Sequence, residues 1–174
     1  VHKTGTPLVV VLVNGSALAV NWAEKHATAV VELWYPGEEG GTALADVLFG
    51  DYNPAGRLPV TFYKSVEDLP PFRDYAMAGH TYRFFEGEVL YPFGYGLSYT
   101  EFTYSDFQLS AVDISVGDSL EVSAVVTNTG AVPGDEVVQL YVSDVDASVP
   151  VPLRHLEGFE RVHLLPGEGR KVSF

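Results

Sequence analysis

Cysteine is absent from this chain of 174 residues. Disulfides, thiolate metal ligands and cysteine nucleophiles are therefore excluded. The absence leaves localisation open, since a secreted or periplasmic domain can be stable without disulfides. The chain begins at Val1 without an initiator methionine and stops at Phe174 within a strand-like alternation. We expect both ends to be cut from a longer protein, which would place any targeting segment outside this sequence.

Basic side chains are also scarce, with 10 Lys and Arg against 23 Asp and Glu and a net charge of −13. Nucleic acids and anionic membrane surfaces select for basic patches, so neither is expected as a partner. No apolar run approaches the ~18 residues of a membrane-spanning helix. The hydrophobic content of 47% predicts a folded core.

The first part of the chain alternates strand-like and helix-like patterns. Residues 7–13 form a continuous apolar run, which predicts a strand buried on both faces as in a parallel sheet. The remaining elements are expected as a helix at 17–26, a strand at 29–35, a helix at 40–50 closed by Gly50, and a strand at 57–63. This order predicts an α/β sheet with too few elements to stand alone. Residues 1–63 are therefore expected to be the C-terminal part of a larger α/β domain.

Residues 64–100 are expected to be an irregular loop followed by an aromatic connector. No clear periodicity is present at 64–89, although 80–85 alternates weakly and predicts a short strand. The stretch 90–99 contains four aromatics, two glycines and a proline. It predicts a rigid joint between two modules, with Phe93 and Tyr95 buried and the glycines tightly packed.

Residues 101–174 contain strand-like patterns and no helix signal. Apolar and polar residues alternate at 120–127 and around 137–142, and further strand-like runs lie at 159–165 and 171–174. Short alternating strands with regular turns predict a β-sandwich. There are fewer candidates than the seven strands such a fold needs, so we expect an incomplete, C-terminally truncated sandwich.

The aromatic residues of this second part bear on its function. Tyr104, Phe107, Tyr141 and Phe159 fit strand-core positions. An exposed, planar strip of these rings would instead indicate a carbohydrate-binding or adhesion module, because aromatic faces suit sugar rings.

Two acidic residues are the first candidates for hydrolytic chemistry. Glu38 and Glu39 follow a predicted strand, which is where α/β folds place ligands, and glycoside hydrolysis needs two carboxyl groups. They also precede a predicted helix, whose N-terminus favours negative charge, and we interpret them as structural. The five histidines lack metal-like spacing, and no phosphate loop or dinucleotide fingerprint is present. No metal and no cofactor are therefore predicted.

The irregular loop is the strongest candidate for contact with a substrate. It places polar and aromatic groups together on a segment without its own core, and the predicted substrate-proximal residues are Asp74, Tyr75, His80 and Arg83. The alternative is that the loop aromatics only dock it on a neighbouring domain; these are Tyr82, Phe84 and Phe85.

Several long motifs occur in the order of one known family. Residues 35–62, YPGEEGGTALADVLFGDYNPAGRLPVTF, resemble the late part of the second domain of glycoside hydrolase family 3. Residues 91–99, YPFGYGLSY, look like that family's connector into its C-terminal fibronectin type III-like domain, to which 128–142 and 156–159 are similar. The segment 74–85 looks most like members described as β-xylosidases or β-glucosidases, where arginine is commoner at the position of His80.

The resemblance implies a partial α/β sandwich at 1–63, a loop and connector at 64–100, and an incomplete fibronectin type III-like β-sandwich at 101–174. It implies a retaining β-glycosidase acting on terminal non-reducing β-D-glucosyl or β-D-xylosyl residues of an oligo- or disaccharide. The nucleophilic aspartate of an N-terminal barrel and the acid/base glutamate would both lie upstream of Val1, so no catalytic residue is assigned here. We expect the fragment alone to be structural and inactive. The alternative is a carbohydrate-binding module, or one that stabilises or dimerises its parent as a homodimer.

Overall fold

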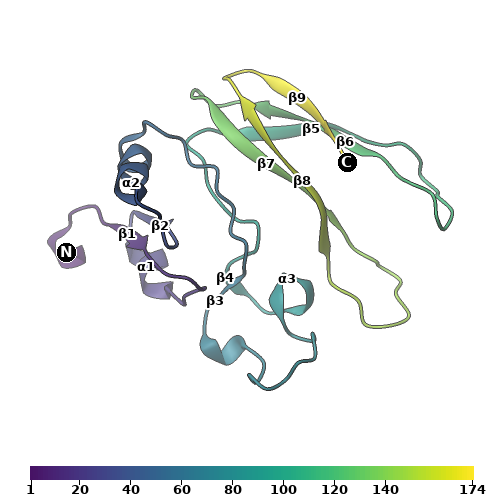
Figure 1. Cartoon of the computed structure of the whole chain (residues 1–174), viewed down its shortest axis with the longest axis horizontal. Helices are drawn as coiled ribbons and strands as arrows, with labels where there is room; N and C mark the ends of the chain where they lie inside the picture. The colour runs from purple at the N-terminus through teal and green to yellow at the C-terminus, as the bar shows by residue number, and fades with distance from the viewer. The chain divides into compact units, whose positions relative to one another are not determined.

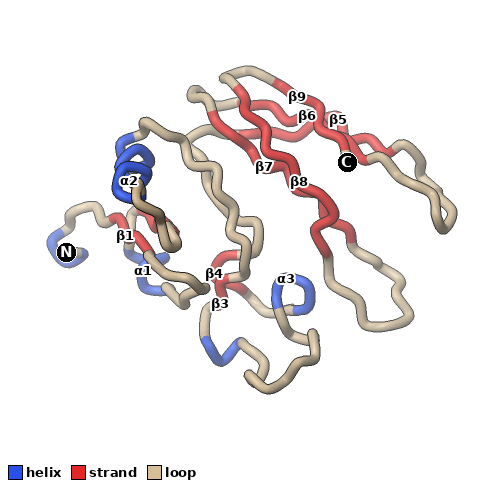
Figure 2. The backbone as a smooth tube through the Cα atoms, in the orientation of Figure 1, coloured by secondary structure: helices blue, strands red, loops and turns tan.

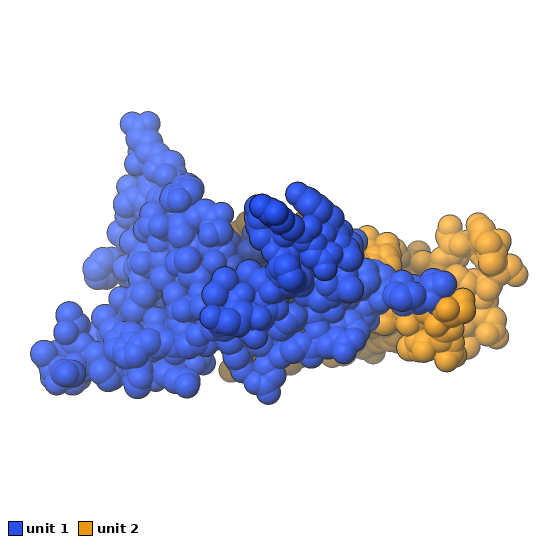
Figure 3. Space-filling view, turned by 90° about the horizontal axis from the view of Figure 1, so that it is seen from below, with its two compact units in different colours: residues 1–51, 58–95, 149–153 blue, residues 52–57, 96–148, 154–174 orange.

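The computed structural model describes residues 1–174, which form two compact units. Unit 1 consists of residues 1–51, 58–95 and 149–153, and unit 2 of residues 52–57, 96–148 and 154–174 (Figure 3). Each unit therefore takes a short segment from the sequence range of the other. Unit 1 is mixed α and β, and unit 2 is all β (Figure 2).

The N-terminal part of unit 1 contains a parallel pair of strands. After a 3-10 turn at His2–Thr4, β1 (Val9–Leu12) pairs with β2 (Ala29–Glu32), and the crossover contains α1 (Asn21–His26) (Figure 1). The predicted strand–helix–strand unit is confirmed, but the helix begins at Asn21 and not near residue 17. The expectation of burial on both faces of the first strand is wrong for Val9, which is 42% exposed, because a face is buried only where another element packs on it.

The second helix confirms its local signals. α2 spans Gly40–Phe49 and ends at Gly50, whose φ of 86° is left-handed and whose N–H donates to the Val47 carbonyl. Glycine is favoured there because a Cβ strains the left-handed conformation. At the other end, a Cβ on Gly40 would lie 2.4 Å from Cβ of Pro36, so this glycine allows the preceding turn to pack on the helix.

The third predicted strand is shorter than expected and does not join the sheet of the first two. β3 contains only Phe62–Tyr63 and pairs antiparallel with β4 (Val89–Tyr91), outside the parallel pair. Leu58 instead hydrogen-bonds the connector, donating to the Tyr95 carbonyl at 2.8 Å and accepting from the Gly94 N–H at 2.8 Å. The backbone groups before β3 are therefore engaged by a segment distant in sequence, which local periodicity does not encode.

Residues 64–88 contain two single turns of helix. A 3-10 turn at Val66–Asp68 is closed by a capping box between Ser65 and Asp68, and α3 spans Thr81–Phe84. The short strand predicted at 80–85 is therefore wrong. The Phe84 N–H donates to the His80 carbonyl, which closes the turn locally and leaves these groups unavailable to a sheet.

The connector is packed less uniformly than expected. Phe93 is half-buried, but Tyr95 is 39% exposed, so burial of both rings is wrong; the Tyr95 ring instead stacks on Tyr91 with centroids 5.4 Å apart. Tight packing holds at Gly96, where a Cβ would lie 2.1 Å from the Gly56 carbonyl oxygen. No side chain larger than hydrogen fits at this position.

Unit 2 is the expected sandwich of two antiparallel sheets. One sheet has the order β5 (Phe102–Leu109), β6 (Val122–Asn128), β9 (Gly169–Ser173), and the other pairs β7 (Gly134–Val142) with β8 (His155–Leu164). Side chains from β6, β7, β8 and β9 meet in the core; they are Val126, Val138, Val162, Leu164 and Val172. The alternating patterns thus predicted the all-β class correctly.

The strand-core positions assigned to the aromatics are wrong for three of them. Tyr104, Phe107 and Phe159 are 52%, 68% and 68% exposed. On β5 the register shifts between Ser105 and Gln108, so the simple alternation breaks between the two aromatic positions. Tyr141 is half-buried, with the guanidinium carbon of Arg154 5.3 Å from its ring centroid.

Candidate functional site

The sequence-predicted loop residues divide into two places. Asp74 and Tyr75 lie at an exposed tip, where an Asp74 carboxylate oxygen accepts the Ala76 N–H at 2.9 Å and Tyr75 is 91% exposed. The Asp74 carboxylate therefore closes a local turn. Phe72, on the same tip, is 97% exposed, so this tip presents two unshielded aromatic faces.

His80 and Arg83 lie at α3 instead. His80 directly precedes the helix, and its Nε2 is buried without a hydrogen-bond partner in this chain. The Arg83 guanidinium carbon lies 6.0 Å from the Tyr82 ring centroid. The backbone carbonyl of Arg83 accepts the Leu153 N–H at 2.6 Å. None of the described hydrogen bonds joins this pair to Asp74 or Tyr75.

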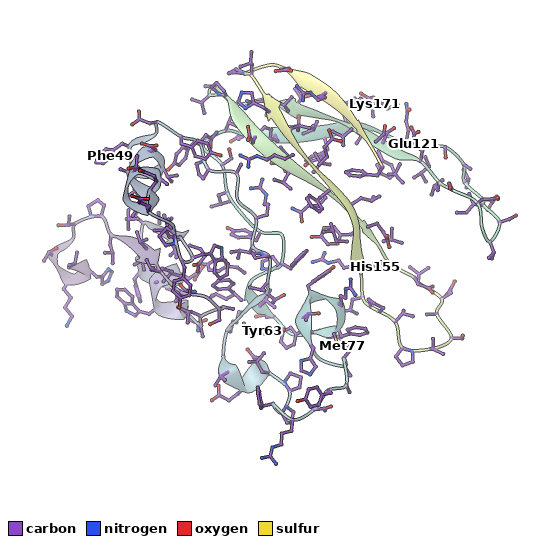
Figure 4. The ribbon with its side chains drawn as sticks, viewed as in Figure 1. Phe49, Tyr63, Met77, Glu121, His155 and Lys171 are labelled. Atoms are coloured by element: carbon purple, nitrogen blue, oxygen red, sulfur yellow. The ribbon has the colours of Figure 1, made fainter.

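The loop aromatics pack within unit 1. The Tyr82 ring stacks on Phe93 with centroids 4.2 Å apart, and Phe85 meets Tyr63 edge-to-face at 4.9 Å. The Tyr63 hydroxyl also accepts the Thr81 N–H at 3.0 Å. Figure 4 labels Tyr63 on β3 and Met77 on the loop. These contacts anchor α3 and leave the preceding tip exposed.

A second polar cluster, which the sequence analysis missed, lies where the parallel strands end. The Asn14 amide nitrogen donates to the Ser16 carbonyl at 2.5 Å and to a Glu32 carboxylate oxygen at 3.4 Å. The other Glu32 oxygen accepts the Trp34 N–H at 3.0 Å. Open α/β sheets bind ligands at the carboxyl ends of their parallel strands. This rule could have identified Asn14 and Glu32 as candidates from the sequence.

An open pocket of about 520 Å³ lies beside this cluster, within the size range of small-molecule sites. Its lining residues are Gly15, Ser16, Ala17, Trp34, Pro59 and Val60. Trp34 has a φ of 56°, an unusual value for a residue with a side chain. The lining contains no carboxylate, and the nearby Glu32 already accepts two hydrogen bonds. The pocket therefore lacks the carboxyl pair that glycoside hydrolysis requires.

The two glutamates before α2 behave as structural residues. Both are exposed, and a Glu39 carboxylate oxygen accepts the Thr42 hydroxyl at 2.9 Å across the first turn of the helix. This agrees with their interpretation as helix-terminal charges.

No group of three or more His, Asp or Glu side chains could hold a metal ion. None of the helices has both the length and the apolar character needed to cross a bilayer.

Comparison with known families gives two matches. Residues 1–99 match the glycosyl hydrolase family 3 C-terminal domain, and residues 136–174 match a fibronectin type III-like domain.

Individual relatives agree with these matches. The chain is 46% identical over 183 residues to a periplasmic β-glucosidase of Salmonella typhimurium, covering 98% of this chain and 24% of that protein. It is 45% identical over 179 residues to a β-xylosidase of Formosa agariphila, covering 100% of this chain and 25% of that protein. The chain therefore spans about a quarter of the length of these curated relatives.

Solved structures show the same fold. β-Glucosidase 3B from Thermotoga neapolitana, in complex with glucose, superposes with a TM-score of 0.89 at 33% identity, covering 99% of this chain and 26% of that one. A β-glucosidase from Erythrobacter marinus gives a TM-score of 0.86 at 40% identity, covering 99% of this chain and 23% of that one.

Proposed function

Because the chain belongs to glycoside hydrolase family 3, we propose that it is the C-terminal quarter of a retaining β-glycosidase acting on terminal non-reducing β-D-glucosyl or β-D-xylosyl residues. The observation that carries this proposal is the family match over residues 1–99, together with the names of the relatives. An oligo- or disaccharide is the substrate, and an N-terminal barrel domain in the remaining part of the enzyme is the intramolecular partner.

The chain itself contributes support and not the hydrolytic groups. Hydrolysis of a glycosidic bond needs two carboxyl groups facing the same bond. Glu32 is held by hydrogen bonds, and Glu38 and Glu39 lie at a helix start. As the resemblance to the family implies, the nucleophilic aspartate and the acid/base glutamate belong to the part of the enzyme before Val1.

Activity measurements test whether the catalytic groups lie outside this chain. The purified chain and the product of the complete reading frame are assayed with aryl β-glucoside and aryl β-xyloside. We expect turnover from the complete product alone. Turnover by the chain that survives replacement of Glu32, Glu38 and Glu39 with glutamine would overturn the assignment of catalysis to the missing part. Absence of turnover from both proteins with both substrates would overturn the glycosidase itself.

We also propose that the loop containing Asp74, Tyr75, His80 and Arg83 lies next to the substrate in the complete enzyme. The support is the exposed Tyr75 ring, which offers an aromatic face to a sugar, and the anchoring of α3 by Phe93 and Tyr63. Anchoring of α3 reduces the length of loop that must become ordered when a sugar binds at the tip.

Substitution of Tyr75 tests the role of the loop. In the complete enzyme, Tyr75→Ala should raise KM several-fold with little change in kcat, because it removes binding and not chemistry. Tyr75→Phe keeps the ring face and should retain most of the affinity. Phe49→Ala is the matched control, since Phe49 is 85% exposed at the end of α2. An unchanged KM in Tyr75→Ala would remove the loop from the substrate site.

The second candidate is a carbohydrate-binding or domain-stabilising and dimerising module without hydrolase activity. It is favoured by the exposure of Phe107 and Phe159 on the sandwich, each at 68%. These residues lie on β5 and β8, which belong to different sheets, so they do not form one strip along a single sheet. The family match therefore favours the glycosidase.

A further inference from the structure

The short segment between α2 and β3, residues Tyr52–Arg57, belongs to the sandwich unit, although residues 58–95 separate it from the rest of that unit in the sequence. We call this segment the strap. Its neighbours on both sides, Asp51 and Leu58, belong to unit 1. The contacts of the strap with unit 2 show how the sandwich holds it.

Asn53 connects the strap to two parts of the sandwich. Its amide nitrogen donates to the Pro133 carbonyl at 2.9 Å, just before β7. Its amide oxygen accepts the Ser98 hydroxyl at 3.0 Å and the Tyr99 N–H at 2.8 Å. Three of the four hydrogen bonds available to an asparagine amide are thus made. A Cβ at Gly134 would lie 2.6 Å from the Asn53 nitrogen, so glycine keeps this site open.

Arg57 forms the charged contact of the strap. Its guanidinium lies 2.7 Å from a Glu136 carboxylate oxygen, and each side chain is only 13% exposed. It also donates to the carbonyls of Ala55 and Gly56 at 3.3 and 3.2 Å, which fixes the strap's own backbone. The second Glu136 oxygen accepts the Tyr104 hydroxyl at 2.9 Å. Burial, reinforced by the Glu136 charge, raises the pKa of Tyr104 and keeps it a donor.

Three further strap residues are buried or paired within unit 2. Ala55 is 3% exposed, and the Gly56 carbonyl approaches Gly96 so closely that a Cβ there would lie 2.1 Å away. The Tyr52 hydroxyl accepts a hydrogen bond from Arg161 on β8 at 2.7 Å. The strap thus has contacts with β7, β8 and residues 96–99, and Glu136 links its charged contact to Tyr104 on β5.

We propose that Tyr52–Arg57 is an integral strap of the β-sandwich, held by the hydrogen bonds of Asn53 to residues 98, 99 and 133 and by the Arg57–Glu136 ion pair. The sandwich is therefore not a separable module that begins after the connector. An ordinary linker would be solvated and would lack this set of specific side-chain hydrogen bonds. Without the strap, the Glu136 carboxylate would be left in its low-exposure site without a counter-charge, a costly arrangement.

Hydrogen exchange of the whole chain tests the strap. Arg57→Met removes the charge and leaves Glu136 unpaired, so amides of β5 and β7 should exchange faster by at least about tenfold while those of β1 and β2 do not change. Lys64→Met is the control, because the Lys64–Glu88 ion pair is exposed and belongs to unit 1. Faster exchange confined to β1 and β2, or no change, would overturn the proposal.

Two further variants keep the test decisive if Arg57→Met does not fold. Arg57→Met combined with Glu136→Met replaces both charges by apolar groups and should recover most of the lost protection, because no charge is left unpaired. Asn53→Ala is milder and should increase exchange at the Tyr99 amide, whose acceptor it removes. Failure of the double variant to recover protection, together with an unchanged Tyr99 amide, would show that the sandwich does not depend on the strap.

Discussion

Leu164 and Leu165 are adjacent in sequence and opposite in environment. Leu164 is fully buried in the sandwich core, whereas Leu165 is 54% exposed just after β8. Leu164→Ala should lower the free energy of unfolding of the sandwich by about 2–5 kcal/mol, since it removes transfer energy and leaves a cavity. Leu165→Ala should change it by less than about 0.5 kcal/mol. Denaturant unfolding followed by circular dichroism measures both, and equal effects would contradict this core.

Asp135 on β7 should make stability depend on pH. Partial burial disfavours its ionised form, but hydrogen bonds from His163 and Arg161 outweigh this and lower its pKa. A lowered carboxyl pKa contributes stability that is fully present above the unfolded value, about 3.9 for Asp, and is lost as the pH falls through the folded value.

Asp135→Asn removes this contribution. The difference in melting temperature between the native chain and Asp135→Asn should therefore stay constant from pH 7 to pH 5 and shrink as the pH approaches 3. Asp113→Asn, at an exposed loop position, should have the melting temperature of the native chain at every pH in this range. A difference in melting temperature between the native chain and Asp135→Asn that is as large at pH 3 as at pH 7 would rule out the Asp135 interactions as its origin.

At the scale of elements, one glycine inside α2 and the glycine that ends it should respond oppositely to alanine. Gly50→Ala places a side chain at a φ of 86° and should cost about 1–2 kcal/mol. Gly41→Ala lies inside the helix, where an added Cβ meets nothing within 4 Å, and should stabilise it by about 0.5–1 kcal/mol. Amide exchange of Ala43–Phe49 measures both effects. Destabilisation by both variants would contradict the positions assigned to these glycines.

Elements also differ in how far the sequence predicted them. α2 was predicted at nearly its full length, because its apolar stripe and terminal glycine are local signals. β3 was predicted too long and in the same sheet as β1 and β2, and α3 was predicted as a strand. Both lie where backbone groups pair with residues outside their own segment, such as Leu58 with the connector and Thr81 with Tyr63.

At the scale of the whole molecule, carbohydrate binding separates the two functional candidates. If the chain is mainly support, it should not be retained on insoluble xylan or cellulose. Retention that is lost in both Phe107→Ala and Phe159→Ala would favour the binding module, because these are the exposed sandwich aromatics. Leu165→Ala, also exposed but not aromatic, is the control for loss of general surface hydrophobicity.

The self-association of the enzyme belongs to the same scale. If the sandwich dimerises its parent, light scattering should give two chains per particle for the complete enzyme and one for the product that ends at Tyr99. The same number of chains per particle in both products would exclude dimerisation through this unit.

The candidate site was predicted only in part. The exposed position of Tyr75 could be anticipated from a polar, aperiodic loop, but the separation of Asp74 from His80 could not, since a turn closed by the His80 N–H on the Met77 carbonyl lies between them. Asn14 and Glu32 were missed because they are 18 residues apart and meet only when β1 and β2 pair in parallel. The spacing of residues along a chain does not reveal a contact that forms only when distant strands pair.

The sequence by itself determined the α/β-then-β class, the α2 helix with its glycine cap, and the family, because these depend on local periodicity, turn chemistry and motif order. Only the tertiary structure decided the partner of β3, the exposure of Tyr104 and the place of Tyr52–Arg57 in the sandwich. The hydrogen bond from Asn53 to Pro133 spans 80 residues. A local pattern specifies which face of an element is buried, whereas the partner that buries it is selected by long-range packing.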